Sequence, residues 1–287
     1  MQKISPCLWF DNQAEEAVKF YTSLFKNSKI GKTARYSEDA AQASGQKKDS
    51  VMTVEFQIAG YQMTALNGGP VFKFSSAVSF FVWCDSESEI NGLWEKLSQG
   101  GSALMEINKY PWAERYGWCE DRYGVSWQLM LAPNKQKIAP AFLYVNKLFG
   151  KGEEAINFYT SVFKDSKIEA IHKDPNTKTV MHSVFDLENT PFVLMEGAGD
   201  EHKQVITHGI SFIINCKDQK ELDYYWDKLG QGGNVEQCGW LTDKFGLAWQ
   251  IIPAELGEIM SDPKKAGAAM KALLGMKKID IAKLKEA

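Results

Sequence analysis

The sequence predicts an α+β protein that consists of two tandem copies of one domain, followed by a helical tail. Two observations lead to this prediction. Stretches of the first half return in the same order in the second half, and short apolar runs of strand length alternate with segments of helical periodicity. A chain of 287 residues also has room for two domains that each bury a core.

The repeat is clearest in three pairs of segments. These are residues 14–30 with 152–168, residues 93–101 with 225–233, and residues 117–128 with 239–250. Because the order is kept, we predict that copy one spans residues 1–132 and copy two residues 137–253, joined by a short polar linker. The tail, residues 254–287, is rich in lysine and alanine and carries methionines and leucines at helical spacing. We expect it to pack as an amphipathic helix across a domain or an interface.

Each copy is predicted to contain two modules in which a strand is followed by a helix and three further strands. In copy one, residues 7–10 form an apolar strand, and residues 14–25 have helical periodicity behind an acidic first turn. The same order begins again at residue 78, with an amphipathic helix that a Gly-Gly pair ends at residues 100–101. Copy two lacks about ten residues around positions 109–112, so we expect an extra hairpin or loop in copy one.

Composition narrows the partners and the compartment. Thirty-three basic and 36 acidic residues give a formal charge of −3 with no long run of one sign, so neither nucleic acid nor a membrane surface is an expected partner. No apolar stretch has the length of a signal peptide or a membrane span. The five cysteines form no C-x-x-C pair, which favours buried free thiols in the reducing cytoplasm.

The repeated motifs resemble a known family. A strand followed by Ala/Gly-Glu-Glu-Ala-x-x-Phe-Tyr-x-x-x-Phe, and Gly-Trp-x-x-Asp-x-x-Gly-x-x-Trp-Gln at the end of each copy, resemble the PhnB-like domain labelled 3-demethylubiquinone-9 3-methyltransferase-like. This domain belongs to the vicinal oxygen chelate superfamily, also called the glyoxalase, bleomycin resistance and dioxygenase superfamily. The resemblance covers nearly the whole chain twice. It implies tandem domains in which two βαβββ modules form a cup-shaped sheet that holds a small molecule.

The resemblance leaves the pairing of the modules open, because modules can pair within a copy or across copies. Single-copy relatives are typically homodimers. The tandem is therefore expected to imitate such a dimer, with the copies related by an approximate two-fold axis, as a monomeric pseudo-dimer or as a homodimer.

The resemblance also allows a test for a metal site. Enzymes of the superfamily commonly hold a divalent metal with His, Glu or Gln from the first, fourth, fifth and eighth strands of the cup. The corresponding positions are held by Pro6 and Pro140, Asn67 and Glu196, Ser76 and His208, and Gln128 and Gln250. Copy one contains no histidine, and no cofactor is predicted there. Glu196, His208 and Gln250 are weak candidates for a divalent metal in copy two, unless pairing across copies separates them.

Candidate ligand-binding residues follow from the expected inward faces of the strands. In residues 126–131, period-two alternation places Gln128 on the face opposite Trp127. The candidates are the polar residues Asn67, Gln128, Glu196, His208 and Gln250, the apolar residues Met63, Phe80, Phe192 and Phe212, and Trp112 as a lid or a loop anchor. Asp121 and Asp243 are interpreted as turn residues that bond their own backbone. No catalytic residue is identified.

These observations favour binding of a small apolar or amphipathic molecule without an obligatory metal. Two alternatives stay open: a metal-dependent lyase, isomerase or dioxygenase that uses copy two, and a pseudo-dimeric interaction or regulatory module. The methyltransferase activity in the family's label finds no support in the motifs. The first strand runs into Asp11-Asn12-Gln13-Ala14, without the glycine-rich turn that an S-adenosylmethionine enzyme of the usual α/β kind has between its first strand and helix.

Overall fold

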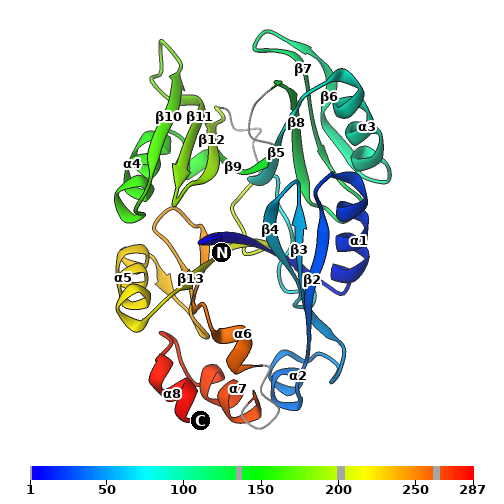
Figure 1. Ribbon diagram of the computed structural model, residues 1–287. Helices are drawn as coiled ribbons and strands as arrows, with labels where there is room; N and C mark the ends of the chain where they lie inside the picture. The colour runs from blue at the N-terminus through cyan, green and yellow to red at the C-terminus, as the bar shows by residue number, and fades with distance from the viewer. Residues whose placement is uncertain (1, 134–137, 199–203, 261–265) are drawn as a thin grey trace.

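The computed structural model describes residues 2–133, 138–198, 204–260 and 266–287 (Figure 1). It contains two mixed sheets of eight strands each, with helices flanking them to the left and right in the view of Figure 1. The strand order is β14-β15-β16-β13-β1-β4-β3-β2 in the first, named sheet A, and β10-β11-β12-β9-β5-β8-β7-β6 in the second, named sheet B. This confirms the predicted α+β fold, and each sheet contains half of each copy.

The elements follow the predicted order of four modules and a tail. Module one comprises β1 (Ile4–Phe10), α1 (Ala14–Leu24), β2 (Lys29–Arg35), α2 (Glu38–Ser44), β3 (Val51–Ile58) and β4 (Tyr61–Asn67). Module two comprises β5 (Val78–Cys84), α3 (Glu87–Ser98), β6 (Ser102–Tyr110), β7 (Ala113–Glu120) and β8 (Ser126–Leu131).

Copy two contributes modules three and four. Module three comprises β9 (Ile138–Tyr144), a 3-10 turn (Asn146–Leu148), α4 (Gly152–Val162), β10 (Lys167–Lys173), β11 (Val180–Leu187) and β12 (Thr190–Glu196). Module four comprises β13 (Ile210–Cys216), α5 (Gln219–Gly230), β14 (Asn234–Val235), β15 (Trp240–Thr242) and β16 (Ala248–Pro253). The tail holds α6 (Leu256–Ile259), α7 (Ala266–Leu274) and α8 (Ile281–Glu286), and none of the helices in the described ranges is long and apolar enough to cross a membrane.

The modules pair across the copies. In sheet A, β1 of copy one runs antiparallel to β13 of copy two, with Cys7 opposite Ser211. In sheet B, β5 of copy one runs antiparallel to β9 of copy two, with Ser79 opposite Ala141. Exchanging the copies converts the strand order of sheet A into that of sheet B, as an approximate two-fold relation requires. The question that the sequence left open is therefore answered in favour of cross-pairing.

The core lies between the two sheets and under the helices. Trp127 on β8 and Trp249 on β16 are fully buried in it. The rings of Phe142 in sheet B and Phe212 in sheet A meet edge to face, with their centroids 5.6 Å apart, so this core joins the two sheets directly. We name the opposite face of each sheet, which carries Gln250 in sheet A and Gln128 in sheet B, its cup face.

A buried aspartate connects the helix and the sheets within each copy. In copy one, Asp121 Oδ1 accepts hydrogen bonds from the backbone N–H groups of Tyr123 (2.8 Å) and Val125 (3.1 Å). This confirms its predicted role in the turn. Its Oδ2 accepts from the Tyr21 hydroxyl of α1 (2.7 Å) and from Trp127 Nε1 (2.8 Å). The same carboxylate therefore fastens α1, which packs on sheet A, to the β7–β8 turn of sheet B.

Copy two repeats this arrangement around Asp243. The carboxylate accepts from Phe245 and Leu247 backbone N–H groups, and also from the Tyr159 hydroxyl and Trp249 Nε1, both at 2.8 Å. Burial raises the pKa of both aspartates, while the donors around them lower it. The four donors offset much of the cost of burying the carboxylate.

The tail replaces a hairpin that copy two lacks. In copy one the extra segment is the long β6–β7 hairpin, as predicted. At the equivalent place in copy two, the backbone N–H groups of Cys238 and Gly239 donate to the carbonyl groups of Met276 (2.7 Å) and Lys277 (2.8 Å) in the tail. In Figure 1 the tail runs along the bottom of the molecule from α5 to α2, and α7 packs against α2.

We predict that the Asp121 network contributes strongly to stability. Asp121→Ala leaves four buried or half-buried donors without their acceptor, so the free energy of unfolding should fall by about 3–5 kcal/mol. Tyr21→Phe removes one of the four hydrogen bonds and should cost about 1 kcal/mol. Urea denaturation measures both changes. The exposed Glu95→Ala on α3 is the control, and a loss below about 1 kcal/mol for Asp121→Ala would contradict this role.

Candidate functional site

The two cup faces are defined by strand register. Cup A is the inner face of sheet A, where Cys7 lies opposite Ser211 and next to Gln250. Cup B is the inner face of sheet B, where Phe81 lies beside Gln128 in the parallel pairing of β5 with β8. The glutamine and serine recur in both cups, because Gln128 Nε2 donates to Ser79 Oγ and Gln250 Nε2 donates to Ser211 Oγ, each at 2.9 Å.

Gln128 is held firmly at the floor of cup B. Its side chain is 1% exposed, and its Oε1 accepts a hydrogen bond of 2.6 Å from the Tyr116 hydroxyl. Together with the bond to Ser79, this fixes the orientation of the amide. Within the described residues these are the bonds of its side chain, so one N–H and one oxygen lone pair are left for a further partner.

Aromatic and small side chains surround Gln128. The ring centroid of Phe81 lies 4.8 Å from that of Trp83 and 6.3 Å from that of Tyr116. The small side chains of Ala139 and Ala141 belong to the same cluster. At the rim, the exposed Trp112 stacks on Tyr110 at 5.1 Å and meets Tyr116 edge to face. The predicted lid residue therefore lies in the aromatic group of cup B.

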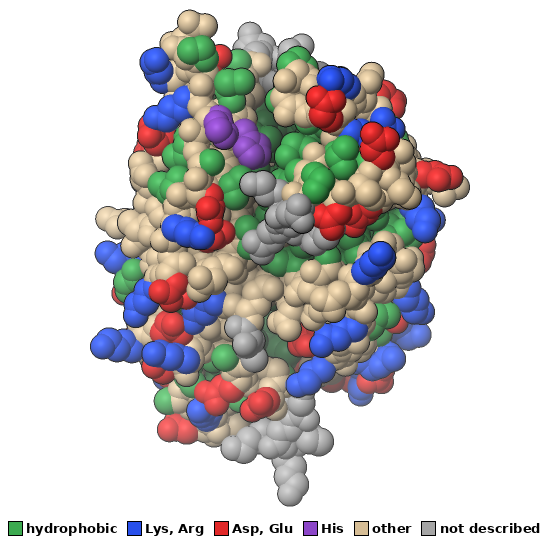
Figure 2. Space-filling view, turned by 45° about the horizontal axis from the view of Figure 1, so that its top comes forward, with side chains coloured by type: hydrophobic (Ala, Val, Ile, Leu, Met, Phe, Trp, Pro, Cys, Tyr) green, Lys and Arg blue, Asp and Glu red, His purple; other side chains and the backbone are tan. Residues whose placement is uncertain are grey.

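His182 is a polar residue of cup B that sequence reasoning missed. It lies on β11 and contacts Phe81 edge to face at 5.8 Å. Its Nε2 is buried, with no hydrogen-bond partner in the part of the chain that the structure describes. Burial, with a smaller contribution from His172, lowers its pKa to about 4, so the imidazole is neutral at pH 7. Figure 2 shows histidine side chains with hydrophobic side chains on either side.

Cup A has a different character. Burial raises the pKa of the Cys7 thiol to about 11, despite the opposing effect of Gln250 and Ser211, so the thiol stays protonated. The position equivalent to Tyr116 is Cys238, which has a positive φ of 59° and bonds to the tail. The Gln250 amide therefore lacks the tyrosine partner that Gln128 has.

His208 lies before β13, in the part of the chain that leads into sheet A. Its Nε2 is 3.1 Å from Glu236 Oε1 and 3.0 Å from Thr242 Oγ1, and its ring stacks on Phe72 at 4.7 Å. Thr242 also donates to the same Glu236 oxygen at 2.9 Å. His208, Glu236 and Thr242 therefore form a local hydrogen-bonded cluster.

Four predicted apolar residues face the core and not a cup. Phe80 packs on Trp127 at 5.3 Å, and Phe212 packs on Trp249 at 5.5 Å. Phe192 and Met63 belong to the same core. The prediction that these side chains face a cup was wrong. The positions that face the cup are shifted by one residue along each strand, as the pairing of Phe81 with Gln128 shows.

Asn67 and Glu196 also face away from the cups, and each accepts a hydrogen bond at the N-terminus of a helix. Asn67 Oδ1 accepts from the backbone N–H of Ala14 at 2.9 Å, at the start of α1. Glu196 is its counterpart and accepts from Gly152, at the start of α4, at 3.0 Å, as well as from Gly150 and Val180. An acceptor at a helix N-terminus satisfies N–H groups that have no partner within the helix.

The donors in the cups do not fit a divalent metal. Pro6 and Pro140 pair with Phe212 and Phe80 on the core side, and their inward neighbours are Cys7 and Ala141. Glu196 belongs to sheet B, whereas Gln250 belongs to sheet A and His208 precedes a strand of sheet A, so the three candidates are not brought together. Within the described ranges, no group of three His, Cys, Asp or Glu side chains is arranged to hold a metal ion.

The fold is similar to that of glyoxalase I. Glyoxalase I from Zea mays matches it with a TM-score of 0.56 at 13% identity, over 91% of this chain and 97% of that chain. A point mutant of the same enzyme gives a TM-score of 0.57 at 12% identity, over 88% of this chain and 93% of that chain. Such low identity shows the fold alone.

The chain belongs to the 3-demethylubiquinone-9 3-methyltransferase family, whose model matches residues 2–130 and again residues 136–252. The PhnB protein from Bacillus cereus, a 3-demethylubiquinone-9 3-methyltransferase by its name, is 40% identical over 46% of this chain and 100% of that chain, with a TM-score of 0.42. No curated protein matches the chain. The family and the two copies predicted from the motifs are confirmed.

We predict that divalent metal does not contribute to stability. Besides the His182 imidazole in cup B, the cup donors are a thiol of raised pKa, hydroxyls and amides, and within the described ranges no group of three His, Cys, Asp or Glu side chains is placed to hold such an ion. Protein purified without a histidine tag should contain far less than one equivalent of metal, and a chelator should shift the melting temperature by less than about 1 °C. One equivalent of tightly held ion that is lost with a drop in melting temperature would contradict this prediction.

We also predict a specific pH dependence from His182. Its pKa is about 4 in the folded protein and about 6.5 when unfolded. The unfolded chain therefore takes up a proton first, and the stability contributed by the neutral imidazole is lost as the pH falls from 6.5 towards 4. Between pH 6.5 and 4.5, the free energy of unfolding should fall by about 2 kcal/mol more in the wild type than in His182→Phe.

Urea denaturation at the two pH values measures this difference. His172→Phe is the matched control, because His172 lies opposite on β10 and is exposed. Its slope should stay close to that of the wild type, because His172 makes only the smaller contribution to the lowered pKa of His182. Equal slopes for the wild type and His182→Phe would show that His182 titrates normally.

Proposed function

We propose that the protein binds a small, uncharged molecule with an apolar, planar body in cup B, without an obligatory metal. The observation that carries this proposal is the combination of an aromatic wall with two fixed polar groups, Gln128 and His182. An apolar pocket with a few oriented hydrogen-bonding groups is the usual form of a small-molecule site. The fold supports the proposal, because it is one that typically binds small molecules.

The polar groups define the ligand further. His182 is neutral at pH 7, and Gln128 carries no charge, so neither attracts an ion. A ligand hydroxyl or carbonyl can pair with His182 Nε2. This nitrogen donates in one tautomer of the neutral imidazole and accepts in the other. The ring faces of Phe81, Trp83 and Tyr116 favour a flat partner. We therefore favour an aromatic alcohol or ketone over a carboxylate or an amine.

We do not propose methyl transfer, although the family is named for a methyltransferase. The chain lacks the glycine-rich turn after its first strand, and the inner faces of the sheets carry side chains suited to contact with an apolar body. Binding requires only the residues already described. We assign no bond-making step to them.

A binding experiment with a neutral fluorescent phenol, 2-naphthol, tests the proposal. Wild-type protein should bind it with a change in tryptophan fluorescence, since Trp83 and Trp112 lie in cup B. His182→Phe keeps the ring but removes the polar nitrogen, so affinity should fall about five- to tenfold, equivalent to about 1–1.4 kcal/mol. His172→Phe should bind like the wild type.

Gln128→Leu and Gln250→Leu form a matched pair for the two cups. The first should weaken 2-naphthol binding by about 1–3 kcal/mol, the range for a lost buried hydrogen bond, and the second should leave it unchanged. Circular dichroism checks that both variants fold. An effect of Gln250→Leu alone would place the ligand in cup A, and no effect of any of these variants would refute a site in either cup.

A further inference from the structure

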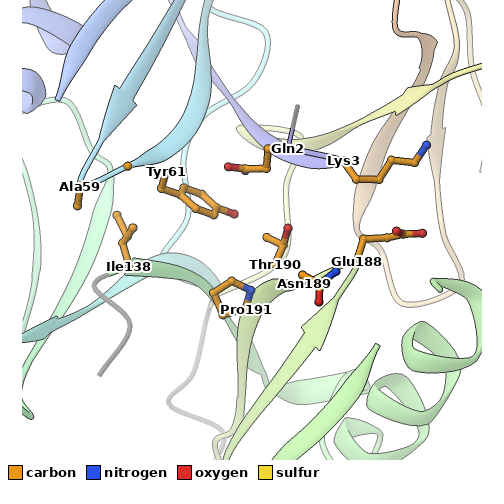
Figure 3. Close-up of a pocket in the computed structure, with 10 residues that line it drawn as sticks. Gln2, Lys3, Ala59, Tyr61, Ile138, Glu188, Asn189, Thr190 and Pro191 are labelled. Carbon is orange, nitrogen blue, oxygen red and sulfur yellow. The ribbon is translucent and has the colours of Figure 1, made fainter. Parts of the chain in front are cut away.

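A cavity lies at the seam between the two sheets, and none of its lining residues belongs to the site proposed in cup B. Its volume is about 540 Å³, which is within the range of small-molecule sites. It is lined by the β3–β4 turn of copy one, the β11–β12 turn of copy two and the starts of β1 and β9 (Figure 3). The two turns are equivalent in the repeat, so the cavity lies where the approximate two-fold relation brings the copies together.

The same local structure builds both turns. Ala59 and Gly60 have φ values of 49° and 84°, and Glu188 and Asn189 have φ values of 49° and 58°. Two successive left-handed residues form the tight hairpin that suits the twist of paired strands. The next residue in each strand, Tyr61 in one copy and Thr190 in the other, then faces the cavity from opposite sides (Figure 3).

The charged residues around the cavity are already paired. Lys3 Nζ lies 2.6 Å from Glu221 and donates to the carbonyl oxygen of Asn215 at 2.8 Å. Glu188 Oε1 accepts from the Tyr225 hydroxyl at 2.8 Å. In Figure 3 the side chains of Lys3 and Glu188 extend away from Tyr61. The cavity therefore gives an ion no unpaired charge to bind.

Tyr61 supplies the unsatisfied polar group. Its side chain is 6% exposed, and its hydroxyl oxygen is buried with no hydrogen-bond partner among the residues described. A buried hydroxyl without a partner is unfavourable, and an acceptor that enters the cavity relieves this cost. Burial raises the pKa of Tyr61, so the group is protonated and can donate. Ile138 and Pro191 provide an apolar wall nearby.

We propose that this seam cavity is a second binding site, for a small uncharged molecule whose carbonyl oxygen accepts a hydrogen bond from Tyr61. The apolar part of the ligand packs on Ile138 and Pro191. The site is separate from the proposed site in cup B, because none of the residues proposed for the cup lines this cavity.

Cyclohexanone is the probe, and its binding is measured by ligand-observed NMR titration. The wild type should bind it, whereas Tyr61→Phe should bind it at least fivefold more weakly, because only the donor is removed. Cyclohexanecarboxylate and cyclohexylammonium have the same ring with a charge, and they should not bind. Tyr116→Phe, which alters the tyrosine of cup B, is the control and should leave the affinity for cyclohexanone unchanged.

Tyr61→Phe should also fold with at least the stability of the wild type, because the lost hydroxyl has no partner among the described residues of the free protein. This separates a binding defect from a folding defect. Failure of the wild type to bind cyclohexanone, equal binding by Tyr61→Phe, or binding of either charged analogue would overturn the proposal. None of these results depends on whether 2-naphthol binds in cup B.

Discussion

The architecture depends on one buried carboxylate in each copy. Asp121 and Asp243 each join two backbone N–H groups of a turn to a tyrosine on a helix and a tryptophan on a strand. The tyrosine comes from the first module of its copy and the aspartate from the second. Because these two modules belong to different sheets, the aspartate holds the sheets together through their shared core. A hydrogen-bonded carboxylate adds the fixed geometry that apolar contacts alone do not impose.

Cross-pairing has a direct consequence for the site. Gln128 and Tyr116 come from copy one, whereas His182 and the alanines of the floor come from copy two. Cup B is therefore complete only when both copies are folded and paired. In a single-copy protein, the same combination would require a dimer, and the tandem chain supplies both halves at a fixed ratio and a high effective concentration.

The repeat and the alternation of strands and helices were sufficient to predict the family, the modules and the extra hairpin. The inner faces were harder to predict, because β5 and β9 are buried on both sides and show no alternation of polar and apolar residues. The position of Phe80 relative to Phe81 depends on the register with β8, which a single strand does not reveal. His182 was missed for a related reason: it approaches Phe81 only because β11 belongs to the same sheet as β5, and this follows from the pairing of modules across copies.

The two cups have diverged from a common plan. Both keep a glutamine bonded to a serine, but only cup B has the tyrosine that completes the network and the long hairpin that carries Trp112. In copy two the chain turns at Cys238, and the tail bonds to the place that the hairpin occupies in copy one. The tail therefore covers this edge of copy two. Cup A also carries aromatic side chains, because the ring of Trp9 lies near those of Phe72 (centroids 4.9 Å apart) and Trp240 (6.1 Å). We assign binding to cup B because the described residues combine the hydrogen bond between Gln128 and Tyr116 with His182 there, although the sequence repeats its motifs in both copies.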